Sequence, residues 1–261
     1  MDLGLTGKVA LVSGASKGLG YGVARALASE GARVSICSRD INNITAAAVK
    51  LTNETGAEVA PFAVDVTNAN DIQTWIDASV SKFGKIDALL VNAGGPPGGP
   101  FKSFTDAQWQ AAFELTLMSA VRMIRGVLAH LNSDASILTI TSSSVHEPIE
   151  RLVLSTVMRL GVAGLVKTLA DELAPQRIRV NNLIPGRFDT ERVAQLDAAA
   201  AARTGLSTEE VRTLSIAKIP LGRLGTIDDF GRAATFLLSP AAAFISGTSL
   251  RVDGGMLRSI V

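Results

Sequence analysis

The chain has 261 residues, of which 47% are hydrophobic and 19% are charged, and its formal net charge at pH 7 is +1. This composition excludes a disordered chain, and the balanced charge argues against a nucleic-acid or anionic-membrane partner. The single cysteine, Cys37, excludes an internal disulfide and a cysteine-rich metal site. The first residues do not form a secretory signal, and no apolar run approaches the ~20 residues of a membrane helix. We therefore expect a cytoplasmic protein without a metal site.

Strand-like and helix-like stretches alternate along the chain. The expected strands are mostly continuous apolar runs, which are typical of a parallel sheet covered on both faces. We predict strands at Val9–Val12, Arg33–Cys37, Glu58–Val64, Ala88–Val91, Ile137–Ile140, Ile178–Leu183 and Leu250–Val252. We predict helices at Gly18–Ser29, Asn43–Thr52, Asp71–Lys82, Asp106–His130, Leu152–Leu173 and Asp228–Leu238. This order indicates the α/β class, with a Rossmann-type doubly wound parallel sheet in a single domain over residues 1–261.

One stretch, from Pro185 to Pro220, is less regular than the rest. It contains the alanine run Ala198–Ala202 and a helix-start signal, Ser207-Thr208-Glu209-Glu210. An insertion after the carboxyl end of a strand is where a substrate lid is found in folds of this kind. We expect such a lid around residues 186–220.

A glycine-rich turn follows the first predicted strand and begins the first predicted helix. It reads Gly14-Ala15-Ser16-Lys17-Gly18-Leu19-Gly20, and the only tyrosine of the chain, Tyr21, comes directly after it. Glycines permit the tight turn and let the backbone approach a pyrophosphate, whose negative charge the helix N-terminus favours. The turn therefore predicts a nucleotide-phosphate cradle formed by Gly14, Ser16, Lys17, Gly18, Leu19 and Gly20.

Further polar or small residues occur where the later strands end. They are Asp65 and Val66, Asn92 with Ala93 and Gly94, Ser142, Pro185 and Gly186 with Thr190, and the closing run Val252-Asp253-Gly254-Gly255. Asp65 and Asn92 each have an ordinary explanation as a turn residue. Together all of these residues lie at the carboxyl ends of the strands, where open α/β sheets bind ligands.

With these motifs in this order, the chain resembles the short-chain dehydrogenase/reductase family, and within it the β-ketoacyl-(acyl carrier protein) reductase-like branch. The resemblance covers nearly the whole chain, from Gly7 to Gly255. It implies that Asp65 and Val66 bind the adenine ring, and that Asn92, Ala93 and Gly94 line the adenine ribose and the nicotinamide side. It also implies that Pro185, Gly186 and Thr190 hold the nicotinamide amide.

The end of the second strand indicates which nicotinamide cofactor is bound. An acidic residue there would accept hydrogen bonds from the 2′-hydroxyl of NAD, but the strand ends Cys37-Ser38-Arg39 and no carboxylate occurs before Asp40. Arg39, next to Ser38, and Lys17 in the glycine turn could bind a 2′-phosphate by charge-assisted hydrogen bonds. We therefore predict NADP(H), the alternative being that both cations are solvated surface residues.

The catalytic positions depart from the family pattern. The family has a serine thirteen residues before a tyrosine and a lysine four residues after it, and these positions here are Ser142, Ser155 and Arg159. An asparagine expected in the long helix 106–130 is replaced by Thr116. Ser155 and Arg159 still share one helix face, but a serine is a far weaker acid than a tyrosine, and arginine does not release its proton. Arg159 could still bind the cofactor ribose.

The missing tyrosine leaves two hypotheses open. In the first, the protein is an NADP(H)-dependent enzyme that transfers a hydride between NADPH and a small-molecule carbonyl or its alcohol. Ser142 would polarise the oxygen, and water, Ser155 or His146 would supply the proton. In the second, it binds NADP(H) without turnover, as a subunit of an oligomer. The helices 106–130 and 152–173 are apolar on more than one side, and the family resemblance points to a homotetramer built on them.

Overall fold

The computed structural model describes residues 2–260 and contains one parallel sheet of seven strands in the order β3-β2-β1-β4-β5-β6-β7. The strands are β1 (Val9–Ser13), β2 (Arg33–Ser38), β3 (Val59–Ala63), β4 (Ile86–Val91), β5 (Leu131–Ile140), β6 (Arg179–Pro185) and β7 (Ser249–Val252). Strands β1 and β4 pair with one another in parallel, and the strand order reverses at this pair. Strands β2 and β3 continue the sheet on the side of β1, and β5, β6 and β7 continue it on the side of β4. This confirms the predicted Rossmann-type doubly wound sheet in a single domain.

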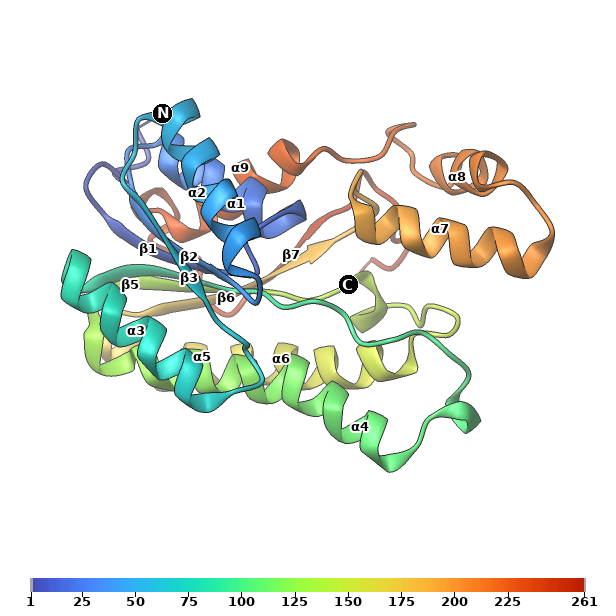
Figure 1. Ribbon diagram of the computed structural model, residues 1–261, viewed down its shortest axis with the longest axis horizontal. Coiled ribbons are helices and arrows are strands. Elements are labelled where there is room, and N and C mark those ends of the chain that lie inside the picture. The colour runs from blue at the N-terminus through green and yellow to red at the C-terminus, as the bar shows by residue number, and fades with distance from the viewer. Residues whose placement is uncertain (1, 261) are drawn as a thin grey trace.

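Helices cover both faces of the sheet (Figure 1). The α-helices are α1 (Gly18–Ser29), α2 (Ile41–Thr55), α3 (Ala69–Phe83), α4 (Asp106–Phe113), α5 (Ser119–Val127), α6 (Val153–Glu172), α7 (Glu191–Thr204), α8 (Thr208–Ile216) and α9 (Ile227–Leu238). Single turns are η1 (Phe101–Ser103), η3 (Leu128–His130), η4 (Ser143–Val145), η5 (Ala174–Gln176) and η6 (Pro240–Ala242). Helices α1, α2 and α9 lie on one face, and α3, α5 and α6 lie on the other.

Each face of the sheet has its own apolar core, because neighbouring residues of a strand point to opposite faces. Within β1, Ala10 and Val12 belong to the core beneath α1, whereas Val9 and Leu11 belong to the core beneath α3 and α5. This explains why the strands are continuous apolar runs in the sequence. The thiol of Cys37, on β2, is fully buried in the second core, and this burial raises its pKa to about 12.

The predicted long helix 106–130 is interrupted. Between α4 and α5 the helix widens into a π-helical segment, η2 (Glu114–Met118), and its last turn, η3, is a tighter helix. Thr116 lies in the middle of this segment. The apolar periodicity continues through the irregularity, so the pattern that predicts the helix does not reveal it. Single-turn π segments within α-helices occur frequently at functional sites.

The segment between β6 and α9 contains two helices, α7 and α8, that project beyond the sheet as a separate lobe (Figure 1). The predicted start of the second one is confirmed by a capping box. The Ser207 hydroxyl accepts a hydrogen bond from the backbone N–H of Glu210 at 3.2 Å, and the Glu210 carboxylate accepts one from the backbone N–H of Ser207 at 2.8 Å.

The expectation that no apolar run approaches the length of a membrane helix was wrong for α6, which is long and apolar enough, by length and composition alone, to cross a membrane. It lies on the sheet next to β6, and its buried side chains include Met158, Val162 and Val166. It also bears the polar pair Ser155 and Arg159, so we interpret it as a core helix of the sheet.

Candidate functional site

The glycine turn between β1 and α1 is so tightly packed that a side chain at Gly14 or Gly20 would clash with its neighbours. Gly14 and Gly18 have φ angles of 62° and 63°, which favour glycine. A Cβ at Gly20 would lie 2.3 Å from the Gly14 carbonyl oxygen, and one at Gly14 would lie 2.8 Å from Asn92 Nδ2. Ser16 and Leu19 lie in the same turn and are partly exposed.

The first turn of α1 is free to receive an anion. Its N-cap residue, Lys17, makes no side-chain capping hydrogen bond, and no acidic side chain lies in the first turn. The backbone N–H groups of that turn have no partner within the helix, and the helix dipole favours negative charge there. The predicted residues therefore fit a dinucleotide pyrophosphate.

Lys17 has a partner that the sequence does not indicate. Its ammonium group forms an ion pair with the carboxylate of Glu191, the first residue of α7. Both side chains are exposed, so the ion pair links the glycine turn to the projecting lobe across the surface. A phosphate that binds Lys17 would have to displace Glu191 or share the ammonium with it.

Asp65 and Arg39 lie near one another beyond the ends of β3 and β2. The Asp65 carboxylate accepts hydrogen bonds through Oδ1 from the backbone N–H of Thr67 at 2.9 Å and from its hydroxyl at 2.8 Å. These hydrogen bonds, and in smaller part the charge of Arg39, hold the pKa of Asp65 below its ordinary value. Arg39 is exposed, while Val66 is buried beside Asp65. Ser38 ends β2 and donates to the Asp40 carbonyl at 3.3 Å.

Asn92 joins the ends of β1 and β4. Its backbone N–H donates to the Ser13 hydroxyl at 2.8 Å, and its side-chain amide donates to the carbonyls of Ser13 and Gly14 at 3.3 and 3.2 Å. Ala93 and Gly94 follow directly, and a Cβ at Gly94 would meet nothing within 4 Å. This junction fixes the glycine turn at the point where the strand order reverses, which is where such sheets bind dinucleotides.

The turn after β6 brings Thr190 over the glycine cradle. A Cβ at Gly18 would lie 3.9 Å from Thr190 Cγ2, and Thr190 accepts a hydrogen bond from Val193 as the N-cap of α7. Gly186 follows Pro185, and a Cβ added at Gly186 would lie 2.6 Å from the backbone of Asp253. The segment around Asp253 therefore packs against this turn.

Ser142, Ser155 and Arg159 come from β5 and α6. Ser142 follows the end of β5, and its hydroxyl accepts a hydrogen bond from the backbone N–H of Ser144 at 3.1 Å. On α6, Arg159 Nε donates to the Ser155 hydroxyl at 3.3 Å, and Arg159 Nη1 donates to the Ile140 carbonyl at 2.7 Å. The last carbonyl of β5 therefore holds the guanidinium at the end of the sheet.

A small cavity connects Arg159 to the end of β4. It is lined by Val91, Asn92, Ala93, Thr116, Ser119, Ala120, Ile140, Arg159 and Val162. Thr116 Oγ1 is buried and has no hydrogen-bond partner among the described residues. Thr116 of the π segment therefore lines the same cavity as Arg159, and its hydroxyl is left without a partner among the described residues.

His146 and Tyr21 differ in their relation to this site. His146 ends the turn η4 that begins after Ser142, and its Nε2 is buried without a hydrogen-bond partner among residues 2–260. Tyr21 is buried on α1, and its hydroxyl donates to Glu54 of α2 at 3.4 Å. Burial and, to a smaller degree, Glu54 raise the pKa of Tyr21. The only tyrosine therefore belongs to the packing of α1 against α2.

Sequence reasoning missed Arg192, on the first turn of α7. Its Nη2 donates to the Pro96 carbonyl at 3.2 Å, so the side chain reaches from the projecting lobe to the loop after β4. Burial and, in smaller part, the charge of Arg192 lower the pKa of Arg159 to about 10, which leaves Arg159 charged at neutral pH. Nothing in the sequence around Arg192 distinguishes it from the other arginines of this stretch.

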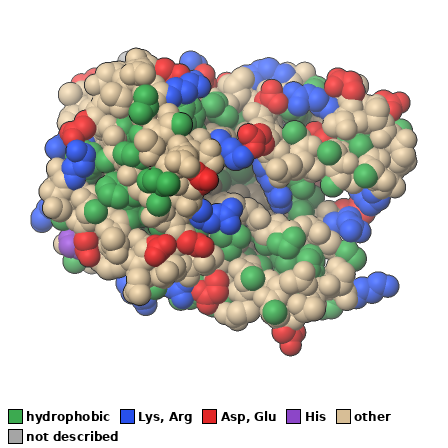
Figure 2. Space-filling model, in the orientation of Figure 1, with side chains coloured by type: hydrophobic (Ala, Val, Ile, Leu, Met, Phe, Trp, Pro, Cys, Tyr) green, Lys and Arg blue, Asp and Glu red, His purple; other side chains and the backbone are tan. Residues whose placement is uncertain are grey.

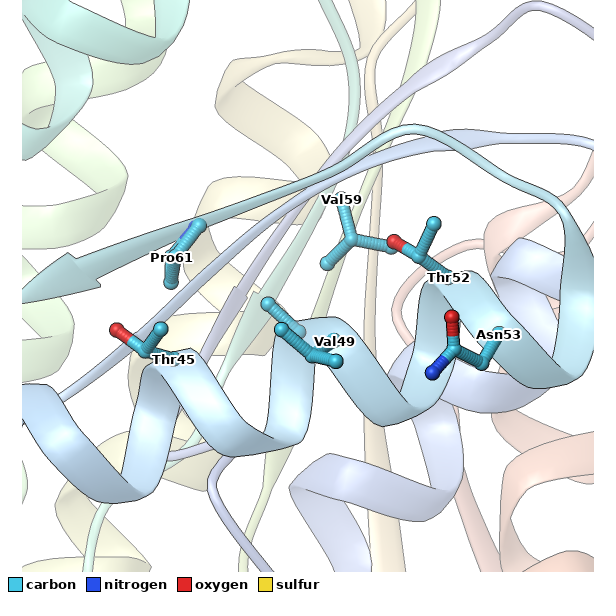
Figure 3. A pocket seen from close by; sticks show the side chains of 7 residues that line it. Thr45, Val49, Thr52, Asn53, Val59 and Pro61 are labelled. Carbon is cyan, nitrogen blue, oxygen red and sulfur yellow. The ribbon is translucent and has the colours of Figure 1, made fainter.

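A separate depression lies at the edge of the sheet between α2 and β3 (Figure 3). It is lined by Thr45, Ala48, Val49, Thr52, Asn53, Val59 and Pro61. None of these side chains titrates, so this depression offers no acid or base. Among residues 2–260, no group of three His, Cys, Asp or Glu side chains converges as metal ligands would.

The geometry therefore combines a nucleotide cradle with a polar cleft at the carboxyl edge of the sheet, and comparison with known proteins gives the family. The family model described as enoyl-(acyl carrier protein) reductase matches residues 14–257. The 3-oxoacyl-[acyl-carrier-protein] reductase FabG of Vibrio cholerae is 31% identical, over 97% of this chain and 99% of its own length. The chain belongs to the short-chain dehydrogenase/reductase family, in its ketoacyl-reductase-like branch.

Two solved structures are similar over nearly the whole chain. L-sorbose reductase from Gluconobacter frateurii, in complex with NADPH and L-sorbose, superimposes with a TM-score of 0.94 at 28% identity and covers 100% of both chains. An NADPH-bound short-chain oxidoreductase from Pseudomonas aeruginosa PAO1 superimposes with a TM-score of 0.87 at 31% identity, over 97% of each chain. That protein is described as containing an atypical catalytic center.

Proposed function

We propose that this chain is an NADP(H)-dependent oxidoreductase that interconverts a small-molecule carbonyl and its alcohol at an atypical active site. The carbonyl carbon gains a hydride and the carbonyl oxygen gains a proton, while NADPH becomes NADP⁺. The observation on which the proposal rests is the pair Ser155 and Arg159, joined at 3.3 Å beside the end of β5, close in sequence to Ser142.

NADP(H) is the cofactor named for the two structural neighbours and the one predicted from Lys17 and Arg39. When bound, it supplies the hydride. In our proposal the phosphates of the cofactor are held by Gly14, Ser16, Lys17, Gly18, Leu19 and Gly20. The 2′-phosphate lies at Ser38 and Arg39, and the adenine lies at Asp65 and Val66. The ribose and nicotinamide lie along Asn92, Ala93, Gly94, Arg159, Pro185, Gly186 and Thr190. The glycine cradle without room for a Cβ and the uncapped start of α1 support this assignment.

The protein's own groups handle the carbonyl oxygen and its proton. Ser142 accepts a hydrogen bond from Ser144, so its own hydroxyl hydrogen is free to be donated to that oxygen. The Arg159 guanidinium donates to the Ser155 hydroxyl, which makes that hydroxyl a better proton donor, and its charge stabilises a developing alkoxide. Water then restores the proton on Ser155.

We assign the lid role to the segment around residues 186–220. Helices α7 and α8 project from the sheet (Figure 1). Three side-chain contacts of α7 bridge to the body of the protein. Glu191 pairs with Lys17, Arg192 donates to Pro96 at 3.2 Å, and Arg203 pairs with Glu150 at 3.3 Å. Opening of the lobe would break these three contacts together.

A second candidate function is the binding of NADP(H) without turnover. It is favoured by the absence of an acidic hydroxyl at position 155 and by the guanidinium at 159, which does not relay protons as an amine does. Under this alternative the cofactor serves to stabilise a subunit of an oligomer.

Turnover assays separate the two functions. Wild type and Ser142→Ala are each mixed with NADPH and a panel of ketones and aldehydes, and with NADP⁺ and the matching alcohols. We expect slow turnover that Ser142→Ala abolishes without changing NADPH affinity by calorimetry. Tight NADPH binding without turnover of any compound would instead establish the binding protein.

A further inference from the structure

Two guanidinium groups lie near one another beyond the carboxyl ends of the strands, one on α6 and one on α7. Arg159 is held on α6 by the Ile140 carbonyl at 2.7 Å, and Arg192 is held on α7 by the Pro96 carbonyl at 3.2 Å. A Cβ at Gly95 would lie 3.2 Å from Arg192 Nη2, so the guanidinium packs closely against this loop. Figure 2 shows a hollow between the body of the protein and the projecting lobe, with Lys or Arg side chains and also Asp or Glu side chains near its rim.

Five acidic side chains of the projecting lobe and of the segments beside it are engaged by other groups. Glu191 pairs with Lys17, Asp189 with Arg212, Asp197 with Arg187 and Glu150 with Arg203, and Glu147 accepts from the backbone N–H of Arg258. Within residues 2–260, neither Arg159 nor Arg192 has a carboxylate within 4.0 Å. The cleft therefore has two positive charges that the protein itself does not neutralise.

The two charges are close enough to act on one another. Burial is the larger cause of the lowered pKa of Arg159, and the positive charge of Arg192 is the smaller cause. The two positive charges therefore repel one another. Two like charges beside a partly closed cleft are destabilising unless an anion lies between them. The pyrophosphate of the cofactor is held elsewhere, at the start of α1, so it does not provide this anion in our assignment.

We propose that the substrate of this site is a carboxylate, namely an oxo acid or the corresponding hydroxy acid, whose carboxylate binds Arg192 while its carbonyl lies at Ser142. This inference rests on the proposed oxidoreductase function and names its substrate class. The guanidinium of Arg192 has free donors besides the one that binds Pro96, and the planar fork of arginine matches a carboxylate with two parallel hydrogen bonds. The positive charge of Arg159 attracts the substrate carboxylate from a distance, while its guanidinium stays beside the substrate carbonyl.

The kinetic test compares acids with their uncharged esters. Pyruvate, acetoacetate and levulinate, each beside its methyl ester, are offered with NADPH to wild type, Arg192→Gln and Arg212→Gln. Arg212→Gln is the matched control, because it removes a cation of the same lobe that already has a carboxylate partner, Asp189, and that makes none of the three bridging contacts. We expect one acid to have a KM roughly 10- to 100-fold lower than its ester, and only Arg192→Gln to remove the difference.

A binding test makes the inference independent of turnover. The NADP⁺ complexes of wild type and Arg192→Gln are titrated calorimetrically with the three acids and the three esters, after NADPH affinity has shown that the variant is folded. Binding of an acid that Arg192→Gln abolishes, without turnover of any pair, would overturn the oxidoreductase and keep the carboxylate site. Equal kcat/KM for acids and esters in wild type would overturn the carboxylate site and keep the oxidoreductase. Reduction of dihydroxyacetone phosphate in preference to every oxo acid would also overturn it, in favour of a phosphate ester.

Discussion

In the proposed active site, position 155 is where the sequence departs from the family pattern that it resembles. Ser155 is 7% exposed, and its hydroxyl accepts a hydrogen bond from the Nε–H of Arg159, so the two positions form a hydrogen-bonded pair on one helix face. The pair has lost acidity, because the serine is a weak acid and the arginine keeps its proton. The pair retains the positive charge of Arg159, which lies beside the end of β5.

The first prediction restores the acid. Ser155→Tyr combined with Arg159→Lys should increase turnover of ketones, because a general acid typically contributes ~10²–10⁴-fold to the rate. The measurement is the steady-state rate of NADPH oxidation, and the control is thermal stability together with NADPH affinity, since position 155 is buried and a tyrosine can overpack it. If wild type already turns over rapidly, another group donates the proton. His146→Ala then identifies it, because a collapse in rate with unchanged NADPH binding would assign the role to His146.

The second prediction concerns cofactor choice. Arg39→Ala should weaken NADPH binding by roughly 10- to 100-fold and leave NADH binding unchanged, because a charge-assisted hydrogen bond to phosphate contributes ~1.5–3 kcal/mol. Lys17→Ala should have a smaller effect, since Lys17 already pairs with Glu191. Calorimetric titration measures both affinities, and Lys50→Ala, which removes an exposed cation of α2, is the control. Equal affinity of wild type for NADPH and NADH would contradict the prediction.

At the scale of elements, the helix ends fix how the lobe and the sheet meet. Helix α9, which follows the lobe, begins with a capping box between Thr226 and Asp229, and Arg223 donates to the Asp229 carboxylate at 2.7 Å. The hydrogen bond from Arg223, followed by those from Thr226, holds the pKa of Asp229 far below its ordinary value. Asp229 thereby joins the chain leaving the lobe to the helix that packs on α1.

The third prediction is a loss of stability at acid pH. Because the pKa of Asp229 is lower in the folded chain than in the unfolded chain, its contribution is present above the unfolded value of about 3.9 and is lost as pH falls through the folded value. Asp229→Asn should lower stability by about 1 kcal/mol at neutral pH, reduced by the partial exposure of the pair, and should flatten the acid side of the stability profile. Thermal unfolding between neutral pH and pH ~3 measures this. Equal acid profiles for wild type and variant would refute it.

Much of the arrangement of elements could be predicted from the sequence, because both faces of the sheet are covered and the strands are therefore continuous apolar runs. The ends were less accurate: α2 begins at Ile41, before the predicted Asn43, because Asp40 caps it by accepting from the Asn43 backbone at 2.8 Å. The π segment around Thr116 and the cleft position of Arg192 could not be predicted, since both depend on packing between distant segments. The roles assigned to the predicted site residues remain predictions.

At the scale of the whole molecule, one face of α6 stays uncovered. Val157 and Leu160 are 47% and 48% exposed, and their spacing places them on the same side of the helix. Exposed apolar side chains on a helix whose other face packs on the sheet are typical of a subunit contact. The predicted homotetramer would bury this face.

The fourth prediction tests that assembly. Val157→Glu with Leu160→Glu should dissociate the tetramer, because it would bury unpaired carboxylates between subunits. Sedimentation at micromolar concentration measures the mass of wild type and variant. Leu214→Glu, on the exposed part of α8, is the control and should not change the mass. A monomeric wild type would exclude the tetramer.

The single thiol of the chain, buried on β2, provides an internal reporter of how the cofactor half of the sheet opens. The Cys37 carbonyl accepts a hydrogen bond from the backbone N–H of Ala15 at 3.1 Å, so departure of the strand from the sheet would break a hydrogen bond to the glycine turn. With a thiol pKa of about 12 and no solvent access, Cys37 reacts with an alkylating reagent only after the strand has left the sheet. Bound NADPH favours the closed form by RT ln(1 + [L]/Kd), so alkylation should slow in proportion to cofactor occupancy. An alkylation rate that does not change with NADPH concentration would mean that the strand leaves the sheet without disturbing the glycine turn.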